Sequence, residues 1–325
     1  MCAPRMDPSH LHIPCSIAYN SLISPTLTEM IMPKIEANGI QLYYEISGKG
    51  TPIVFVHEFA GDHRSWEDQV RFFNRRYRTL VYNARGIPPS DVPEDISDYS
   101  QDIATSDLAG IIQALNLMPA HVVGLSMGGY ATLHLGLRHP ELVRSCVVGG
   151  CGYGSVMSQR EQFQKEANEV ARRIEEEGLE KFGPLYTAGP TRVQLERKDP
   201  IAYEKFQNHF VERSAVGAAN TMRGLQGARP SIYELEGEIK KSRIPTLILT
   251  GDEDEPCLEP AIFMKRTIPT SALVTFPNAG HLINLEEPAM FNRVVLDFIT
   301  EVDAGRWPVR DPRSLSSSSL IPEEK

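Results

Sequence analysis

Short apolar runs alternate with segments of helical periodicity along most of this chain, and this alternation constrains the fold more than any other feature. The runs are continuous, as in PIVFVH at residues 52–57. Runs of this kind are typical of strands buried on both faces of a parallel sheet, which need crossover helices between them. The predicted strands are Pro52–His57, Thr79–Asn83, His121–Leu125, Arg144–Gly150, Pro245–Gly251 and Ala272–Pro277, and the predicted helices are Arg64–Arg75, Ser100–Leu115, Met127–His139 and Glu287–Val302. The sequence therefore predicts an α/β fold with a mostly parallel sheet that helices cover on both faces.

A hairpin opens the predicted fold. Asn38-Gly39 stands between two strand-like runs, Lys34–Ala37 and Ile40–Ile46. Asn-Gly suits the positive φ angles of a two-residue hairpin turn, so these runs are expected to pair with each other.

One long segment interrupts the alternation of strands and helices. From residue 152 to 214 strand-like runs stop, and charged sequence with helical periodicity replaces them. We interpret this segment as a helical cap inserted between two parts of one core. The first residues are interpreted as a disordered leader, or as sequence upstream of a start at Met30 or Met32, and the Ser-rich end as a disordered tail. The expected divisions are leader 1–32, core 33–151, cap 152–214, core 215–303 and tail 304–325.

Charge, apolar run length and cysteine content argue against several function classes. The chain has 33 basic and 42 acidic residues and a formal net charge of −9, whereas nucleic-acid binders normally present a basic face. No apolar run approaches the roughly 20 residues that span a bilayer. Five cysteines without a CxxC pair are typical of neither a disulfide framework nor a zinc site. We therefore expect a cytoplasmic protein with a small-molecule substrate and no cofactor, metal, nucleic-acid or membrane partner; its oligomeric state is left open.

A serine stands at the turn between a predicted strand and a predicted helix. The segment Gly124-Leu125-Ser126-Met127-Gly128 fits G-x-S-x-G in the setting that gives this pattern meaning. The tight turn projects the serine hydroxyl, and the glycines let the helix approach the strand. The helix N-terminus adds free N–H groups and a positive dipole beside the serine. The pattern predicts that Ser126 is a nucleophile.

This turn from strand through serine to helix is known as a nucleophile elbow. With this elbow, the chain resembles the α/β-hydrolase fold family over about residues 33–303. The resemblance implies a Ser-Asp-His triad in the order nucleophile, acid, histidine. The acid maps to Asp254 in Gly251-Asp252-Glu253-Asp254, with Asp252 as the runner-up, and the base maps to His281 in Ala279-Gly280-His281. In that role His281 takes the proton of Ser126, and Asp254 orients the imidazole and stabilises its charged form. A loop similar to the family's D-x-R-G-x-G-x-S at residues 83–90 implies a structural role for Arg85.

The resemblance also implies an oxyanion hole built from two backbone N–H groups, those of Phe59 and Met127. The first of these loops departs from the family pattern, because Glu58 follows His57 where many relatives have glycine. We favour a Glu58 that faces solvent, but a Glu58 that approaches the pocket and shifts the pH profile stays open. The candidate pocket residues are Glu58 together with three aromatic residues of the cap, Tyr186, Phe206 and Phe210.

These features predict a serine hydrolase that forms an acyl-enzyme with a small, partly apolar ester, thioester or lactone. Three alternatives stay open, one of which is an acyltransferase, in which an alcohol outcompetes water for the acyl group. The triad could cleave a carbon–carbon bond, as in meta-cleavage product hydrolases, although their H-G-x-G-P-G-type loop is absent. The chain could also be a non-catalytic ligand receptor on the same fold. Dehalogenases and epoxide hydrolases are disfavoured, because their elbow carries Asp where this chain has Ser126.

Overall fold

The structure is a computed structural model that describes residues 33–315. The predicted leader and the last ten residues of the predicted tail lie outside the described residues. Within the described range, no helix combines the length and the apolar character needed to cross a membrane.

Eight strands form one sheet in the order β1-β2-β4-β3-β5-β6-β7-β8. The hairpin strands β1 and β2 pair antiparallel, as Asn38-Gly39 predicts, and β2 pairs antiparallel with β4. All remaining pairs are parallel, and β5 lies between β3 and β6 with every residue buried. The strands are β1 Lys34–Ala37, β2 Ile40–Ser47, β3 Pro52–Val56, β4 Arg78–Tyr82, β5 Ala120–Leu125, β6 Val143–Gly149, β7 Thr246–Gly251 and β8 Ser271–Phe276.

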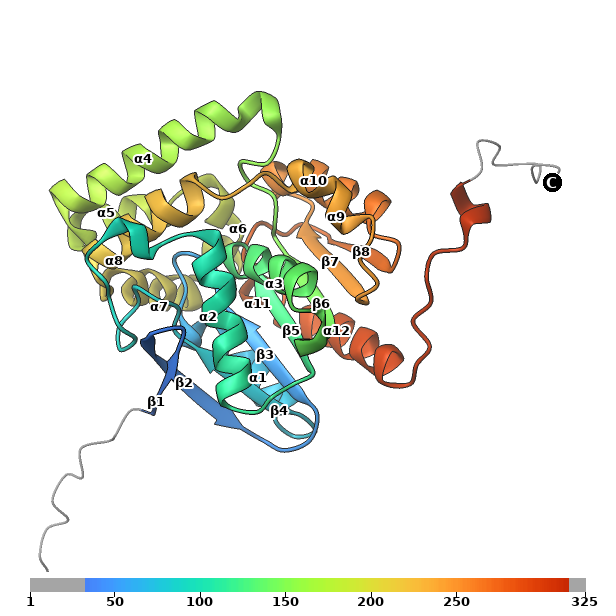
Figure 1. The fold of residues 1–325 in the computed structure, drawn as a ribbon. Coiled ribbons are helices and arrows are strands. Elements are labelled where there is room, and N and C mark those ends of the chain that lie inside the picture. The colour runs from blue at the N-terminus through green and yellow to red at the C-terminus, as the bar shows by residue number, and fades with distance from the viewer. Residues whose placement is uncertain (1–32, 316–325) are drawn as a thin grey trace, which may run out of the picture. The chain divides into compact units, whose positions relative to one another are not determined.

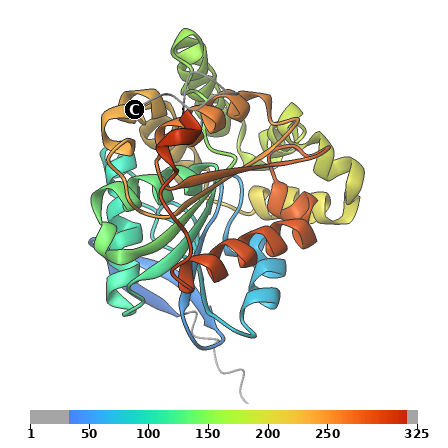
Figure 2. The ribbon, with the colours of Figure 1, turned by 90° about the vertical axis from the view of Figure 1, so that its right-hand side faces the viewer.

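Helices cover both faces of the sheet. Alternate residues of β3 enter two different cores: Ile53 and Phe55 join one, and Val54 and Val56 join the other. The first core includes residues of α1 and α12, and the second includes residues of α2, α3 and α10. Figure 2 shows α12 in red and α1 in light blue on one side of the sheet, with α2 and α3 in green tones on the other. The core helices are α1 Glu67–Phe73, α2 Gln101–Ala114, α3 Met127–Arg138, α9 Glu236–Ile239, α10 Glu255–Thr267, α11 Ile283–Glu286 and α12 Pro288–Asp303. The predicted α/β fold with a doubly covered, mostly parallel sheet is confirmed.

The segment between β6 and β7 contains helices and no strand among the described residues. Figure 1 shows α4, α5, α7 and α8 gathered on one side of the core. Helix α8 and a π-helix at Thr221–Gly227 both pack against α4, so helical packing continues beyond residue 214. The helices that precede α9 in this segment are α4 Arg160–Glu177, α5 Leu179–Thr187, α6 Val193–Lys198, α7 Pro200–Val211 and α8 Ala215–Asn220. The domain limits at 152 and 214 stay predictions.

Helix α1, at Glu67–Phe73, is shorter than the helix predicted over Arg64–Arg75. A 3-10 turn at His63–Trp66 precedes α1, because the Asp62 carboxylate caps the turn by accepting the N–H of Arg64. Trp66 is buried and lies against Phe55 of β3. This arrangement ties the loop after β3 to the core.

Candidate active site

Ser126 occupies a strained turn between β5 and α3. Its φ of 55° and ψ of −113° place a non-glycine residue in a sparsely populated region, and its N–H donates to the carbonyl of Gly149 at 2.8 Å. A Cβ on Gly124 would collide with the carbonyl of Gly128, and one on Gly128 with the carbonyl of Val56. Only glycine permits this close approach of α3 to the sheet. The side chain of Ser126 is half-buried, so its hydroxyl remains accessible.

Asp254 and His281 form a buried pair beside this serine. The Nδ1 of His281 donates to Oδ2 of Asp254 at 2.8 Å, and the two residues are 7% and 1% exposed, His281 being the more exposed. Burial lowers the pKa of the His281 imidazole, but the charge and hydrogen bond of Asp254 outweigh burial, and the pKa is raised overall. The structure records no hydrogen bond from the Ser126 hydroxyl to His281. Such contacts are often long without substrate and tighten in the complex.

The two acids of the loop after β7 point in different directions. Asp252 lies near the surface, where its carboxylate accepts the N–H of Ala279 at 3.0 Å. Backbone N–H groups of Asn278 and Ala279 lower the pKa of Asp252. Asp252 therefore braces the turn that leads to His281, whereas Asp254 contacts the imidazole itself.

Glu286 holds the backbone on both sides of His281. Its carboxylate accepts the N–H of Gly280 at 2.6 Å and the N–H of Leu282 at 2.9 Å. The side chain is buried, and burial raises its pKa against the opposing effect of these bonds. Glu286 stands just before the predicted last helix, and no sequence pattern marks a carboxylate that braces its own chain a few residues upstream.

The loop after β3 presents a free amide at Phe59. His57 Nδ1 donates to the carbonyl of Glu58 at 2.7 Å, and His57 Nε2 accepts the N–H of Ala84 at 3.1 Å. Burial lowers the pKa of His57 to about 4, so the ring stays neutral in this tautomer. The carbonyl of Glu58 and the N–H of Phe59 share one trans peptide and point in opposite directions. His57 therefore orients the Phe59 N–H, which has no acceptor among the described residues.

The second candidate donor of an oxyanion hole is Met127. Met127 is the first residue of α3, and the first N–H groups of a helix have no acceptor within the helix. Its amide follows directly after Ser126, at the positive end of the helix dipole.

The expectation that Glu58 faces solvent is wrong. Its side chain is 2% exposed and lines the same cavity as Ser126 and His281. The nearest cation is Arg192, whose Nη2 lies 3.5 Å from Oε2 of Glu58. A residue of the inserted segment thus compensates the buried charge, and the local sequence around Glu58 gives no sign of it.

A cavity of about 340 Å³ connects Ser126, Asp254 and His281. This volume falls within the range of small-molecule sites. Much of its wall is apolar and comes from the segment between β6 and β7, including Phe163, Ala167, Val170, Leu185, Tyr186 and Met222.

Of the predicted pocket residues, Glu58 and Tyr186 line the cavity, but Phe206 and Phe210 do not. Phe210 is fully buried against the rings of Phe59 and Tyr186, and Phe206 is 3% exposed. Phe210 therefore supports two wall residues from behind, and the ring of Phe206 lies 5.9 Å from the guanidinium carbon of Arg192, another wall residue. Helical periodicity predicts that these rings are buried, but it does not show which residues they pack against.

The inserted segment is tied to the loops that carry the candidate site. The carbonyl of Thr191 accepts the N–H of His281 at 3.1 Å. Gln194 donates to Glu253, the residue before Asp254. The guanidinium of Arg213 donates to the carbonyl of Phe59, and Arg213 is 8% exposed. These residues of the inserted segment, which no sequence motif marks, therefore contact the loops after β3, β7 and β8.

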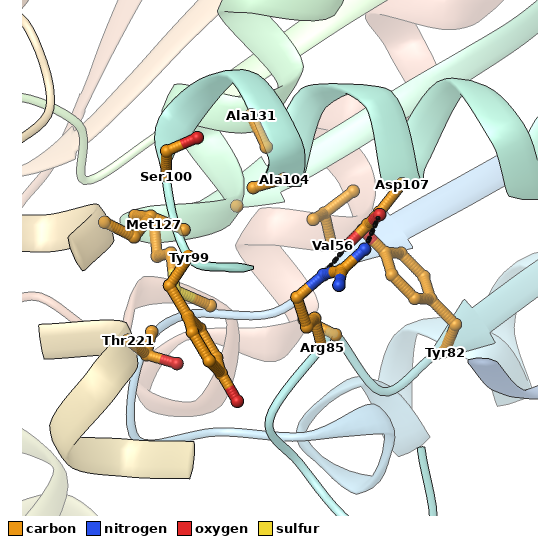
Figure 3. Close-up of a pocket in the computed structure, with 13 residues that line it drawn as sticks. Val56, Tyr82, Arg85, Tyr99, Ser100, Ala104, Asp107, Met127, Ala131 and Thr221 are labelled. Atoms are coloured by element: carbon orange, nitrogen blue, oxygen red, sulfur yellow. Dashed lines mark hydrogen bonds and ion pairs between the residues drawn. The ribbon is translucent and has the colours of Figure 1, made fainter. Parts of the chain in front are cut away.

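A second, smaller cavity of about 30 Å³ lies behind the elbow (Figure 3). Met127 and Ala131 of α3 line it, together with the Arg85–Asp107 pair. Arg85 donates two hydrogen bonds to Asp107 of α2, at 2.8 and 2.9 Å. The geometry agrees with the structural role expected for Arg85.

One group of described residues brings possible metal ligands together: Asp254, Cys257 and His281, with ligand atoms within 4.8 Å of one another. Burial first, and then the charge of Asp254, raise the pKa of the Cys257 thiol well above 9. A metal ligand must be a thiolate, and the carboxylate and imidazole already bind each other. The arrangement fits a hydrogen-bonded pair better than a metal centre.

Comparison with known proteins places these features in a family. The sequence profile described as alpha/beta hydrolase fold matches residues 51–288. The 3-oxoadipate enol-lactonase 1 of Acinetobacter baylyi is 28% identical over 272 residues, which cover 81% of this chain and 95% of that protein. The AB hydrolase superfamily protein YisY of Bacillus subtilis is 28% identical over 276 residues, 80% of this chain and 95% of that protein. The crystal structure of the enol-lactonase from Burkholderia xenovorans superposes with a TM-score of 0.74 at 23% identity, covering 83% of this chain and all of that chain.

Proposed function

The chain belongs to the α/β-hydrolase fold family and is a hydrolase, and on that premise we propose that it is a serine hydrolase with Ser126 as nucleophile, His281 as base and Asp254 as acid. The observation that carries the proposal is the buried 2.8 Å hydrogen bond between Asp254 and His281, in the wall of the cavity that Ser126 also lines.

The first half of the reaction forms an acyl-enzyme. The Ser126 hydroxyl attacks the substrate carbonyl as the His281 imidazole takes its proton. The Asp254 carboxylate stabilises the resulting imidazolium. The carbonyl oxygen becomes an oxyanion that accepts hydrogen bonds from the N–H groups of Phe59 and Met127. Collapse of this intermediate releases the alcohol or thiol, which receives its proton from His281.

The second half of the reaction hydrolyses the acyl-enzyme and regenerates the free enzyme. Water attacks the acyl carbonyl of the ester on Ser126, and His281 takes the proton of the water. The same two N–H groups hold the second oxyanion. When this intermediate collapses, His281 returns a proton to the Ser126 oxygen and the carboxylic acid leaves.

The cavity supports the proposed substrate class. A volume of about 340 Å³ suits a small ester, thioester or lactone, and the apolar wall suits a partly apolar acyl group. The enol-lactonase relatives act on a lactone by name, which supports the inclusion of lactones here.

Ester kinetics test this proposal. Hydrolysis of p-nitrophenyl butyrate should fall by several orders of magnitude in Ser126→Ala, because the substitution removes the attacking atom. Ser97→Ala, at an exposed serine outside the cavity, serves as the matched control and should keep the wild-type rate. A folded Ser126→Ala protein with the wild-type rate would contradict the proposal. Cleavage of dienone acids in place of esters would favour a carbon–carbon hydrolase, and a ligand retained without turnover would favour a receptor.

A further inference from the structure

The Glu58 carboxylate is a buried charge without a hydrogen bond. It is 2% exposed, its Oε1 has no partner among the described residues, and Oε2 has only Arg192 Nη2 at 3.5 Å. A buried carboxylate normally accepts hydrogen bonds, because losing its hydration is costly. Glu58 therefore retains the capacity to accept a hydrogen bond, in the wall of a cavity.

Arg192 has spare donors at the same place. Its guanidinium is 7% exposed and lines the cavity, with Nη1 bonded to the Thr191 hydroxyl at 2.9 Å. Its Nη2 has only distant contacts, with Glu58 and with the Tyr186 hydroxyl, each at 3.5 Å, and its Nε has no described partner. The guanidinium carbon of Arg192 lies 4.8 Å from the centroid of the Tyr186 ring, and this cation–π contact holds the guanidinium in place. The donors of Arg192 are thus fixed in position but not saturated.

The combined charge of the two side chains decides what they can bind. Glu58 repels a carboxylate, and Arg192 repels a cation, so an ionic substrate group gains little from the pair. A neutral hydroxyl gains from both, because it donates to a carboxylate and accepts from a guanidinium. Both residues line the cavity with Ser126 and are close enough to His281 to act on its pKa.

We propose that Glu58 and Arg192 form a polar subsite that selects acyl groups with a hydroxyl close to the scissile carbonyl, so that hydroxyacyl esters or lactones are preferred substrates. The inference rests on the proposed serine hydrolase activity. In the complex, the substrate hydroxyl donates to Glu58 and accepts from Arg192. The hydroxyl thus satisfies both side chains.

A matched pair of esters tests the subsite. The p-nitrophenyl esters of hydroxyacetic acid and propanoic acid differ only by hydroxyl against methyl. For each enzyme variant, the ratio of the two kcat/KM values is measured. The intrinsic reactivity difference between the esters contributes the same factor to every ratio, so it cancels when the variants are compared. Glu58→Met and Arg192→Met should each lower the ratio of hydroxyacetate to propanoate by roughly 10- to 100-fold, the usual effect of losing a hydrogen bond to a buried charged group.

A further ion pair between the inserted segment and the core, Lys198–Glu287, is the matched control. Lys198 Nζ lies 2.6 Å from Oε1 of Glu287, and neither residue lines the cavity. Lys198→Met and Glu287→Met remove an ion pair of the same kind, so they should leave the ester ratio unchanged. Glu58→Gln serves if Glu58→Met does not fold. Glu58→Gln should also raise the rate on the anionic p-nitrophenyl hemisuccinate relative to the propanoate ester. The reason is that this substitution leaves the charge of Arg192 uncompensated.

The outcomes separate the subsite from the proposed function. If the folded wild-type protein hydrolyses neither ester, the serine hydrolase proposal fails. If both esters are hydrolysed and the ratio is the same in the wild type and in the folded variants Glu58→Gln and Arg192→Met, the subsite is refuted and the pair is purely structural. A ratio that falls in these variants and not in the Lys198 and Glu287 controls supports the subsite.

Discussion

Replacing Glu286 by alanine should destabilise the loop that carries His281 more than replacing the neighbouring Glu287. The carboxylate accepts two backbone hydrogen bonds, at 2.6 Å from Gly280 and 2.9 Å from Leu282, and is buried. Glu286→Ala leaves both N–H groups without an acceptor. Each buried, unsatisfied donor costs about 1–3 kcal/mol, so the free energy of unfolding should fall by about 2–6 kcal/mol. The neighbouring Glu287→Ala should cost under about 1 kcal/mol, because it breaks a partly exposed ion pair.

Thermal unfolding of the two variants measures this difference. With an unfolding entropy of about 2.1 cal/mol/K per residue and roughly 280 residues, each kcal/mol lowers Tm by about 1.7 °C. Glu286→Ala should therefore melt about 3–10 °C below the wild type, and Glu287→Ala within about 2 °C of it. Below that transition, Glu286→Ala should also lose at least about tenfold in kcat, because the imidazole is no longer held in position. Equal Tm losses in the two variants, or full kcat in Glu286→Ala, would refute the reasoning.

Three further predictions concern the acid, the pH profile and the pocket. Asp254→Asn should lower kcat by about 10⁴-fold while Asp252→Asn changes it little, and the reverse ranking in ester kinetics would move the acid to Asp252. The imidazole must be neutral to act as base and its pKa is raised, so kcat/KM should fall with acid below a midpoint above about 6.5. The charge of Glu58 raises the pKa of His281 and the charge of Arg192 lowers it, so Glu58→Gln should shift that midpoint to lower pH and Arg192→Met to higher pH. Midpoints that shift in the same direction in both variants would contradict these electrostatics. Phe163→Ala should change the preference among acyl chain lengths by a few-fold to tens of fold, as measured with p-nitrophenyl esters, whereas unchanged preference would remove this ring from the substrate contacts.

Local sequence was sufficient to predict the strands, the elbow and the helices α1, α2, α3 and α12, but α9, α10 and α11 were not predicted. Each predicted core strand agrees with the structure to within about two residues. The positive φ of Ser126 follows from a tight turn between a buried strand and a helix, and the surrounding glycines indicate that turn by their spacing alone. The positive φ values of Asn38 and Gly39 arise in the same way.

The parts that sequence analysis missed depend on contacts between distant segments. Whether Glu58 is exposed depends on Arg192 in the inserted segment, so the local sequence could only leave two interpretations open. Phe210 has the periodicity of a buried residue, but only the tertiary structure shows that it faces Phe59 and not the cavity. The support of Phe59 by Arg213 likewise joins residues from separate parts of the fold.

Active-site labelling tests the central claim most directly. A fluorophosphonate should react with the wild-type protein, and peptide mapping by mass spectrometry should find a single adduct, on Ser126. The Ser126→Ala variant should carry no adduct, while Asp254→Asn should react far more slowly, because the activated hydroxyl depends on the oriented imidazole. An adduct on any other residue, or rapid ester hydrolysis by a protein that the phosphonate leaves unlabelled at Ser126, would contradict the account.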